Sequence, residues 1–152
     1  MPTQWTNADF ESMSWHDCHI HGLHIGEINE DWGACELELD IDYIMEWILE
    51  SDRSFKFRLA PATLTFHRAS GLRMMLDYTG AGMTPFEISG IEREPHIFQG
   101  QVTTYHWRLP ISWPMGESRA ITFDAPGFTQ TLRRDPILHH AQCFTTAERA
   151  GC

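Results

Sequence analysis

The chain has 152 residues and a formal net charge of −10, from 21 acidic and 11 basic side chains. Apolar residues make up 42% of it, and its six Trp and nine Phe exclude the composition of a disordered chain. The length predicts one domain over residues 1–152 that is large enough to bury a core. Because an acidic surface repels phosphate, we expect no nucleic acid as a partner, and a basic protein or a metal cation fits the charge better.

Segments that would direct the chain to a membrane or out of the cell are not evident in the sequence. No run of about 18 apolar residues predicts a transmembrane helix, and the first residues show neither the basic nor the apolar region of a signal peptide. We therefore expect a cytoplasmic protein without a membrane partner. The cysteines lack a CxxC spacing, which predicts free thiols at Cys18, Cys35, Cys143 and Cys152.

Strand and turn patterns follow a polar N-terminal segment, residues 1–14, which we expect to be peripheral. Residues 18–28 have the pattern of a first strand and residues 34–42 that of a second, with turn residues at 29–33 between them. Together they predict a β-hairpin. Residues 43–50 are ambiguous, because they fit one or two helical turns as well as an irregular continuation of the strand.

Further strands are predicted along the rest of the chain, each bounded by turn or breaker residues. Pro61 indicates a bulge or an edge, the pair Ser70-Gly71 a turn, Pro95 the end of a strand, and residues 114–117 another turn. The predicted strands are residues 55–59, 62–67, 72–78, 86–94, 102–113, 119–125 and 128–133. The polar residues 138–152 are expected to be peripheral.

Seven or eight short strands, separated by turns and without long amphipathic helices, define the predicted fold class. It is all-β, or a β-rich α+β fold, built as an antiparallel two-sheet sandwich or a partly open barrel. Open sheets leave edge strands that need cover, and a homodimer is one assembly that would supply it.

The clearest pattern in the chain is an uninterrupted alternation of apolar and acidic residues from Cys35 to Asp42. Side chains of a β-strand point to opposite faces in turn, so the apolar residues are predicted to share a buried face. The other face then carries Glu36, Glu38, Asp40 and Asp42. Three interpretations are open: a solvated face balanced by neighbouring arginines, a docking surface for a basic partner, or a divalent-cation site.

A histidine-rich segment, residues 15–24, lies just upstream of the acidic strand. His19 and His21 are two apart, so on a regular strand they share a face, and Asp17 falls on the same face. Imidazole and carboxylate groups bind zinc and other transition metals, and such a site could activate water. Histidines also occur on half-buried strands without any metal, and the sequence leaves the strand register open. Candidate third ligands are Asp40, Asp42, His67 and His106.

Motifs of well-known catalytic sites are missing from the sequence. We find no G-x-S-x-G elbow, P-loop or G-x-G-x-x-G pattern. With four cysteines and nine histidines, a Cys–His pair arises by chance, so it predicts no nucleophile. A non-catalytic protein is therefore favoured over an enzyme.

Four passages carry a resemblance to a known family: Trp15-His16-Asp17 with His21, Asp40-Ile41-Asp42-Tyr43-Ile44 with Trp47, Phe57-Arg58-Leu59-Ala60-Pro61-Ala62-Thr63-Leu64, and Phe128-Thr129-Gln130-Thr131-Leu132-Arg133. They resemble an uncharacterised family of small bacterial β-rich proteins over most of the chain. Members of this family have no established function, so the resemblance implies no activity and no catalytic residue. Some of them are similar to the small immunity proteins found beside bacterial toxins.

These observations lead to one functional hypothesis and two alternatives. The leading hypothesis is a cytoplasmic, non-catalytic protein-binding domain with an acidic face and no cofactor, for example an immunity-like protein that binds a basic toxin. The first alternative is a metal-dependent enzyme that holds zinc or another transition metal at the His-x-His site. The second is a small-ligand-binding β-barrel with a pocket lined by Trp and Phe.

Overall fold

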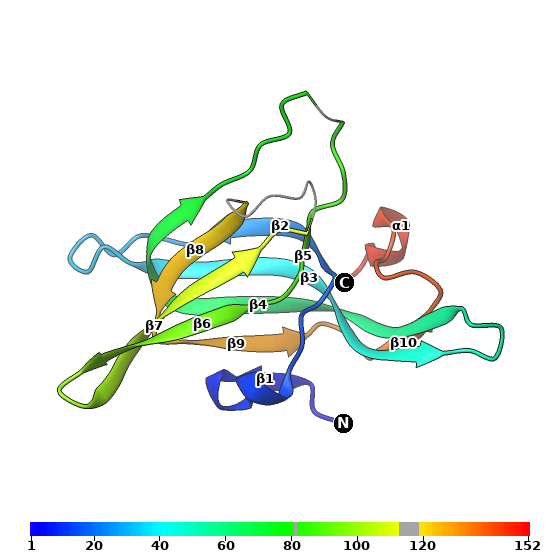
Figure 1. Cartoon of the computed structure of the whole chain (residues 1–152), viewed down its shortest axis with the longest axis horizontal. Coiled ribbons are helices and arrows are strands. Elements are labelled where there is room, and N and C mark those ends of the chain that lie inside the picture. Colours follow the sequence, from blue (N-terminus) through cyan, green and yellow to red (C-terminus); the bar gives the residue numbers. More distant parts are fainter. Residues whose placement is uncertain (81, 113–118) are drawn as a thin grey trace.

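The computed structural model describes residues 1–80, 82–112 and 119–152, so the turn predicted at residues 114–117 lies outside it. In the described residues the protein is all-β, with one antiparallel sheet of ten strands, and the predicted fold class is confirmed. The strands are β1 (Gln4–Thr6), β2 (Cys18–Ile25), β3 (Cys35–Leu49), β4 (Phe55–Met74), β5 (Glu87–Ile88), β6 (Glu92–Phe98), β7 (Gln101–Pro110), β8 (Ala120–Ala125), β9 (Gly127–Leu132) and β10 (Ile137–His139). A 3₁₀ helix (Asn7–Ser12) and one short helix, α1 (Thr146–Arg149), complete the described elements (Figure 1).

The sheet folds into two layers that share the long strand β4. Its main path runs β5-β2-β3-β4-β8-β7-β6, while β9 pairs with β4 and β1, and β10 pairs with β4. The first part of β4 pairs with β10 and β9, and its last residues pair with β8 of the other layer. The strand turns between the layers at Arg68 and Gly71, whose φ angles of 49° and 62° are left-handed. In the described residues, strand β5 at one end of this path meets the chain just after β7 at a single bridge, Ile88–Ile111, and does not pair with β6 at the other end, so the sheet is not closed into a barrel.

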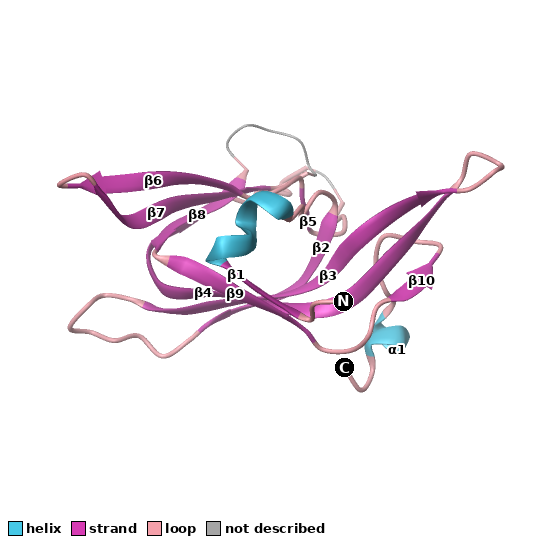
Figure 2. Cartoon of the chain, turned by 90° about the horizontal axis from the view of Figure 1, so that it is seen from below, coloured by secondary structure: helices cyan, strands magenta, loops and turns pink. Residues whose placement is uncertain are grey.

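The core lies between the two layers, as the view in Figure 2 shows. On β3 the alternation places Leu37, Leu39 and Ile41 inward, each fully buried, which confirms the buried face predicted for this strand. Aromatic rings from both layers meet there. The ring of Phe66 lies 4.6 Å from that of Phe123 and 5.0 Å from that of Trp107. These large buried rings supply much of the apolar area that stabilises the fold.

The ambiguous residues 43–50 continue strand β3 as far as Leu49 and form no helix. A shift in register between Ile44 and Glu46 marks a bulge, after which β3 and the start of β4 form a hairpin arm that extends from the body (Figure 2). The arm exposes Trp47 and Leu49 by 41% and 64%. Tertiary pairing with β4 therefore decides a segment whose local pattern fits both structures.

Four residues that were expected to interrupt or end strands act differently in the structure. Pro61 lies inside β4, where the outer partner changes from β10 to β9, so its missing N–H interrupts neither ladder. Ser70 and Gly71 bend β4 without ending it. Pro95 does not end its strand but pairs with Tyr105 inside β6, which is tolerated because β6 is an edge strand.

Both terminal segments, which the sequence suggests are peripheral, contribute an aromatic side chain to the core. Trp5 of β1 is 9% exposed, and its ring centre lies 5.6 Å from that of Tyr43. Phe144, between β10 and α1, is only 2% exposed. Residues 137–149, from β10 to the end of α1, are called the C-terminal clasp below.

The cysteines form no disulfide bond, as the sequence predicts. Cys18 is buried and Cys152 is exposed, while Cys35 and Cys143 are half-buried. Burial raises the pKa of the Cys18 thiol to about 12, so this thiol stays protonated and unreactive at neutral pH. Among the described helices, neither has the length and apolar character that crossing a membrane requires.

Truncating Phe144 tests whether the clasp is part of the folded unit. We expect Phe144→Ala to lower the free energy of unfolding by about 3 kcal/mol, because it removes a buried aromatic ring. The control Leu138→Ala changes a residue that is 52% exposed in the same segment, and should cost less than about 1 kcal/mol. Urea unfolding measures both; equal small effects would show that the clasp is only loosely attached.

Candidate functional site on the outer face of β2, β3 and β4

A β-bulge at His21 decides which side chains share the outer face of the sheet. Ile20 pairs with Ile41 and Leu23 pairs with Leu39, so one extra residue stands on β2 between these inward pairs. As a result His19, opposite Asp42, lies on the same face as the acidic residues. The register that the sequence leaves open is thereby settled: carboxylates and imidazoles are on one face.

The two carboxylates nearest the start of β3 are balanced by histidines. The Glu36 carboxylate lies 2.5 Å from His67 Nδ1 and accepts a hydrogen bond of 3.2 Å from the backbone N–H of Arg68. Glu38 is 46% exposed and lies 3.8 Å from the ring of His24. In the described residues, neither of these two carboxylates forms an ion pair with an arginine or a lysine, in contrast to the two that follow on the strand.

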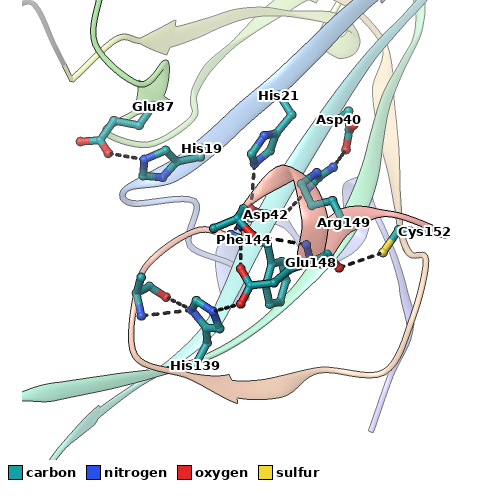
Figure 3. A network of polar contacts seen from close by, with 12 residues as sticks. His19, His21, Asp40, Asp42, Glu87, His139, Phe144, Glu148, Arg149 and Cys152 are labelled. Atoms are coloured by element: carbon teal, nitrogen blue, oxygen red, sulfur yellow. Dashed lines mark hydrogen bonds and ion pairs between the residues drawn. The ribbon is translucent and has the colours of Figure 1, made fainter.

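The other two carboxylates are paired with arginines. Asp40 forms ion pairs with Arg133, at 2.5 Å, and with Arg149. Asp42 is fully buried and contacts His21 at 2.8 Å, the backbone N–H of Phe144 at 2.7 Å, and Arg149 (Figure 3). One arginine of the clasp therefore bridges two neighbouring acidic residues of β3.

The buried Asp42 is held in its charged form. Burial by itself would raise its pKa, but the hydrogen bonds from His21 and from the Phe144 amide, together with the Arg149 charge, lower the pKa below its ordinary value of 3.8. A buried carboxylate is stable only when its lone pairs are satisfied in this way. Asp42 therefore serves as an internal anchor, and its carboxylate is covered by the clasp.

The clasp is organised by contacts of its own. The Thr145 side chain accepts a hydrogen bond from the Glu148 backbone N–H, and Glu148 accepts one from Thr145 N–H, which forms a capping box at the start of α1. These bonds, with His139 at 3.0 Å from Glu148, lower the pKa of Glu148 to about 2. Burial would lower the pKa of His139, but Glu148 and the Ala141 backbone raise it above its ordinary value.

The three predicted metal donors have separate partners. His19 lies 3.4 Å from Glu87, His21 contacts Asp42, and Asp17 lies 3.1 Å from His16. Burial raises the pKa of Glu87, against the opposing effect of His19. Within residues 1–80, 82–112 and 119–152, no group of three or more His, Cys, Asp or Glu side chains is arranged to hold a metal ion. A transition-metal site here remains a prediction.

A hydroxyl, an imidazole and a carboxylate line up across three strands of the same face. His67 Nε2 lies 2.7 Å from Thr129 Oγ1, and its Nδ1 faces Glu36. This order of groups is that of a nucleophile, a base and an orienting acid. However, β9 is paired with β4 and β1 on both sides, so the neighbouring backbone N–H groups serve the sheet rather than a developing oxyanion. The arrangement instead links β3, β4 and β9.

A hollow of about 220 Å³ opens on the acidic face above Gly22. Its walls include His24, Glu38, Asp40 and Arg133. A Cβ atom at residue 22 would lie 3.8 Å from the Asp40 Cβ, so the hollow exists because glycine leaves this position of the outer face bare. It brings the exposed Glu38 carboxylate to the wall of a concave site.

Of the four predicted partner-binding residues, Glu36, Glu38 and Asp40 remain accessible at least in part, while Asp42 is buried. Sequence reasoning missed Gly22, Arg133 and Arg149. A glycine between histidines on an otherwise regular strand was a usable signal for Gly22. Nothing local indicates Arg149, which lies 107 positions from Asp42.

The fold and the site together define an all-β protein with a polar, mainly acidic outer sheet face. No protein-family model, no curated protein and no solved structure matches the chain. The resemblance to a family of small bacterial proteins, and through it to immunity proteins, therefore stays a prediction.

Replacing the buried carboxylate tests its role as an anchor. We expect Asp42→Asn to lower the free energy of unfolding by about 3 kcal/mol, because a fully buried charge is lost and the Arg149 side chain, only 10% exposed, then has one partner fewer. The isosteric control Glu38→Gln removes an exposed carboxylate of the same strand and should change stability by less than about 0.5 kcal/mol. Chemical denaturation of the two variants gives the comparison, and similar losses for both would contradict an anchoring role.

The attachment of the clasp should depend on pH. Because the pKa of Asp42 is lower in the folded protein than its ordinary value of 3.8, ionised Asp42 stabilises the fold above pH 3.8. This stability is lost as the pH falls through the pKa that Asp42 has in the folded protein. Because the pKa of His139 is higher in the folded protein than its ordinary value of 6.5, protonated His139 stabilises the fold below pH 6.5. This stability is lost as the pH rises through the pKa that His139 has in the folded protein. Hydrogen-exchange protection of the Phe144 amide should therefore be greatest between these limits, and His139→Gln should remove the decline at the upper one. A protection factor that does not vary with pH would contradict this coupling.

Proposed function

We propose that the protein is a non-catalytic binding domain whose acidic face receives a basic side chain of a partner protein. An immunity-like role against a basic toxin is a concrete form of this function. The observation that carries the proposal is the hollow above Gly22, where Glu38 is exposed at the wall of a concave, acidic site. A lysine or arginine side chain has the charge and the length to enter such a hollow.

The distribution of countercharge supports this choice of position. Asp40 and Asp42 are balanced by Arg133 and Arg149 within the protein, so they have little free charge to offer. Among the residues that the structure describes, the charged or ionisable group nearest to pairing with Glu38 is the imidazole of His24, at 3.8 Å, a distance that allows a weak interaction. Within the hollow, a basic group from a partner would therefore gain most beside Glu38, because Arg133 in the same wall already balances Asp40. The net charge of −10 would speed its approach.

The first test uses hexalysine as a defined basic probe. Backbone NMR titration at low salt should shift the amides of residues 22–24 and 38–40 more than those of the other layer of the sheet. Glu38→Lys should weaken binding about tenfold, because it reverses the charge at the wall of the hollow. Raising the salt concentration should weaken binding of the natural protein as well, since exposed charges are screened.

Glu94→Lys is the matched control. Glu94 is an exposed residue of β6, and its replacement changes the net charge by the same amount at a distant place. If Glu38→Lys and Glu94→Lys weaken hexalysine binding equally, the probe responds to overall charge, and the acidic face is not the binding site.

A further inference from the structure

A second concave surface lies at the end of the molecule opposite the hairpin arm. The loop between β2 and β3 and the β6–β7 hairpin extend at this end in both views (Figures 1 and 2). Two adjoining hollows, of about 260 and 140 Å³, share Trp32, Ala34 and Arg68 in their walls. None of the functions considered above uses Trp32 or Arg68.

Trp32 is an exposed aromatic ring on a well-held backbone. Its side chain is 69% exposed and borders both hollows, so the face of the ring is open to a ligand. Its backbone N–H donates to the Asn29 side chain at 3.2 Å, and Gly33, at φ 62°, completes the turn. Because these hydrogen bonds already hold the loop, it loses little conformational entropy when a ligand stacks on the ring.

The larger hollow is rich in hydrogen-bond donors. Besides Trp32 it is lined by Arg68 and by three hydroxyl-bearing residues, Ser70, Thr103 and Thr104, of which Thr103 already donates to the His96 carbonyl at 3.2 Å. Glu36 accepts a hydrogen bond from the Arg68 backbone, which helps to hold this residue in its left-handed conformation at the corner of β4. In the part of the chain that the structure describes, the exposed Arg68 guanidinium itself has no hydrogen-bond or ion-pair partner. These groups suit an anionic or oxygen-rich group of a ligand.

The smaller hollow has the opposite character. Its walls include Asn29 and Glu36, whose oxygens already accept hydrogen bonds within the protein, and Glu27, whose exposed carboxylate can accept hydrogen bonds from a ligand. A ligand that spans both hollows would place acceptor groups near Arg68, donor groups near Glu27, and an apolar ring face against Trp32.

We propose that this surface binds an acidic sugar, a pyranose ring that carries a carboxylate. The C–H-rich face of the ring packs on Trp32, the carboxylate pairs with Arg68, and the ring hydroxyls bond to the neighbouring hydroxyl and carboxylate groups. A phosphate ester fits less well, because its charge of about −1.5 to −2 would lie near Glu27 and Glu36 on a protein that is already acidic.

Ligand-observed NMR with glucuronate, glucose and AMP tests the proposal on the full chain. Glucuronate should bind about tenfold more tightly than glucose or AMP. Trp32→Ala should abolish the glucuronate signal, and Arg68→Gln should reduce glucuronate binding to the level of glucose. Thermal unfolding of each variant checks that it remains folded.

Two residues elsewhere supply matched controls. Trp47 is another partly exposed tryptophan, and Arg53 is another arginine with a left-handed backbone, at φ 68°. Trp47→Ala and Arg53→Gln should leave glucuronate binding unchanged. The proposal is overturned if glucuronate does not bind, if glucose or AMP binds as tightly, or if these controls weaken binding as much as the Trp32 and Arg68 variants. None of these variants alters the acidic face, so the result is independent of the hexalysine test.

Discussion

The acidic alternation of β3 is the constraint on which the rest of the structure depends. One face of the strand is core, with Leu37, Leu39 and Ile41 fully buried, so a slip by one residue would bury the carboxylates instead. The register is therefore strongly determined. It also places four acidic side chains in a row along β3 on one face of the sheet. Their like charges repel each other unless groups of opposite charge or hydrogen-bond donors lie between them.

The protein meets this constraint in two ways along the same strand. Near the middle of β3, the C-terminal clasp covers Asp42, and Arg149 pairs with both Asp40 and Asp42 (Figure 3). At the start of β3, histidines of β2 and β4 face Glu38 and Glu36. The first arrangement contributes to the stability of the fold, since it satisfies a buried charge. The second leaves exposed carboxylate beside a hollow, and for this reason we place the proposed binding function there.

Much of the fold could be predicted because its signals are local. Period-two alternation predicted strand β3 and the residues that it buries, and turn residues predicted β2, β7, β8 and β9. The predicted strands 55–59, 62–67 and 72–78 were wrong as separate strands, because β4 runs through the expected turns and ends at Met74, and the predicted strand 86–94 covers β5 and part of β6. Segment 43–50 could not be assigned, because pairing with β4 rather than local pattern makes it a strand. The bulge at His21 was beyond prediction for a similar reason: it depends on the register between β2 and β3.

The site was less predictable, because it depends on contacts between distant parts of the chain. The four carboxylates were found from their spacing, but the arginines that balance two of them lie in and beside the C-terminal clasp. The polarity of residues 138–152 gave no sign that Phe144 enters the core. Asp42 is buried because the segment around Phe144 packs over it. The spacing of residues on β3 cannot show this, since it gives all four acidic residues the same position on the outer face.

A double-mutant cycle between Asp42 and Arg149 tests most directly the claim that a buried ion pair joins the acidic strand to the clasp. The free energy of unfolding is measured for the natural protein, for Asp42→Asn, for Arg149→Gln and for the double variant. The account predicts a coupling energy of about 2 kcal/mol, since each single change removes a charged partner from a group largely shielded from water, even though Arg149 keeps Asp40, and Asp42 keeps His21. Effects that add within about 0.5 kcal/mol would contradict it, and would show that the clasp is held without the pair.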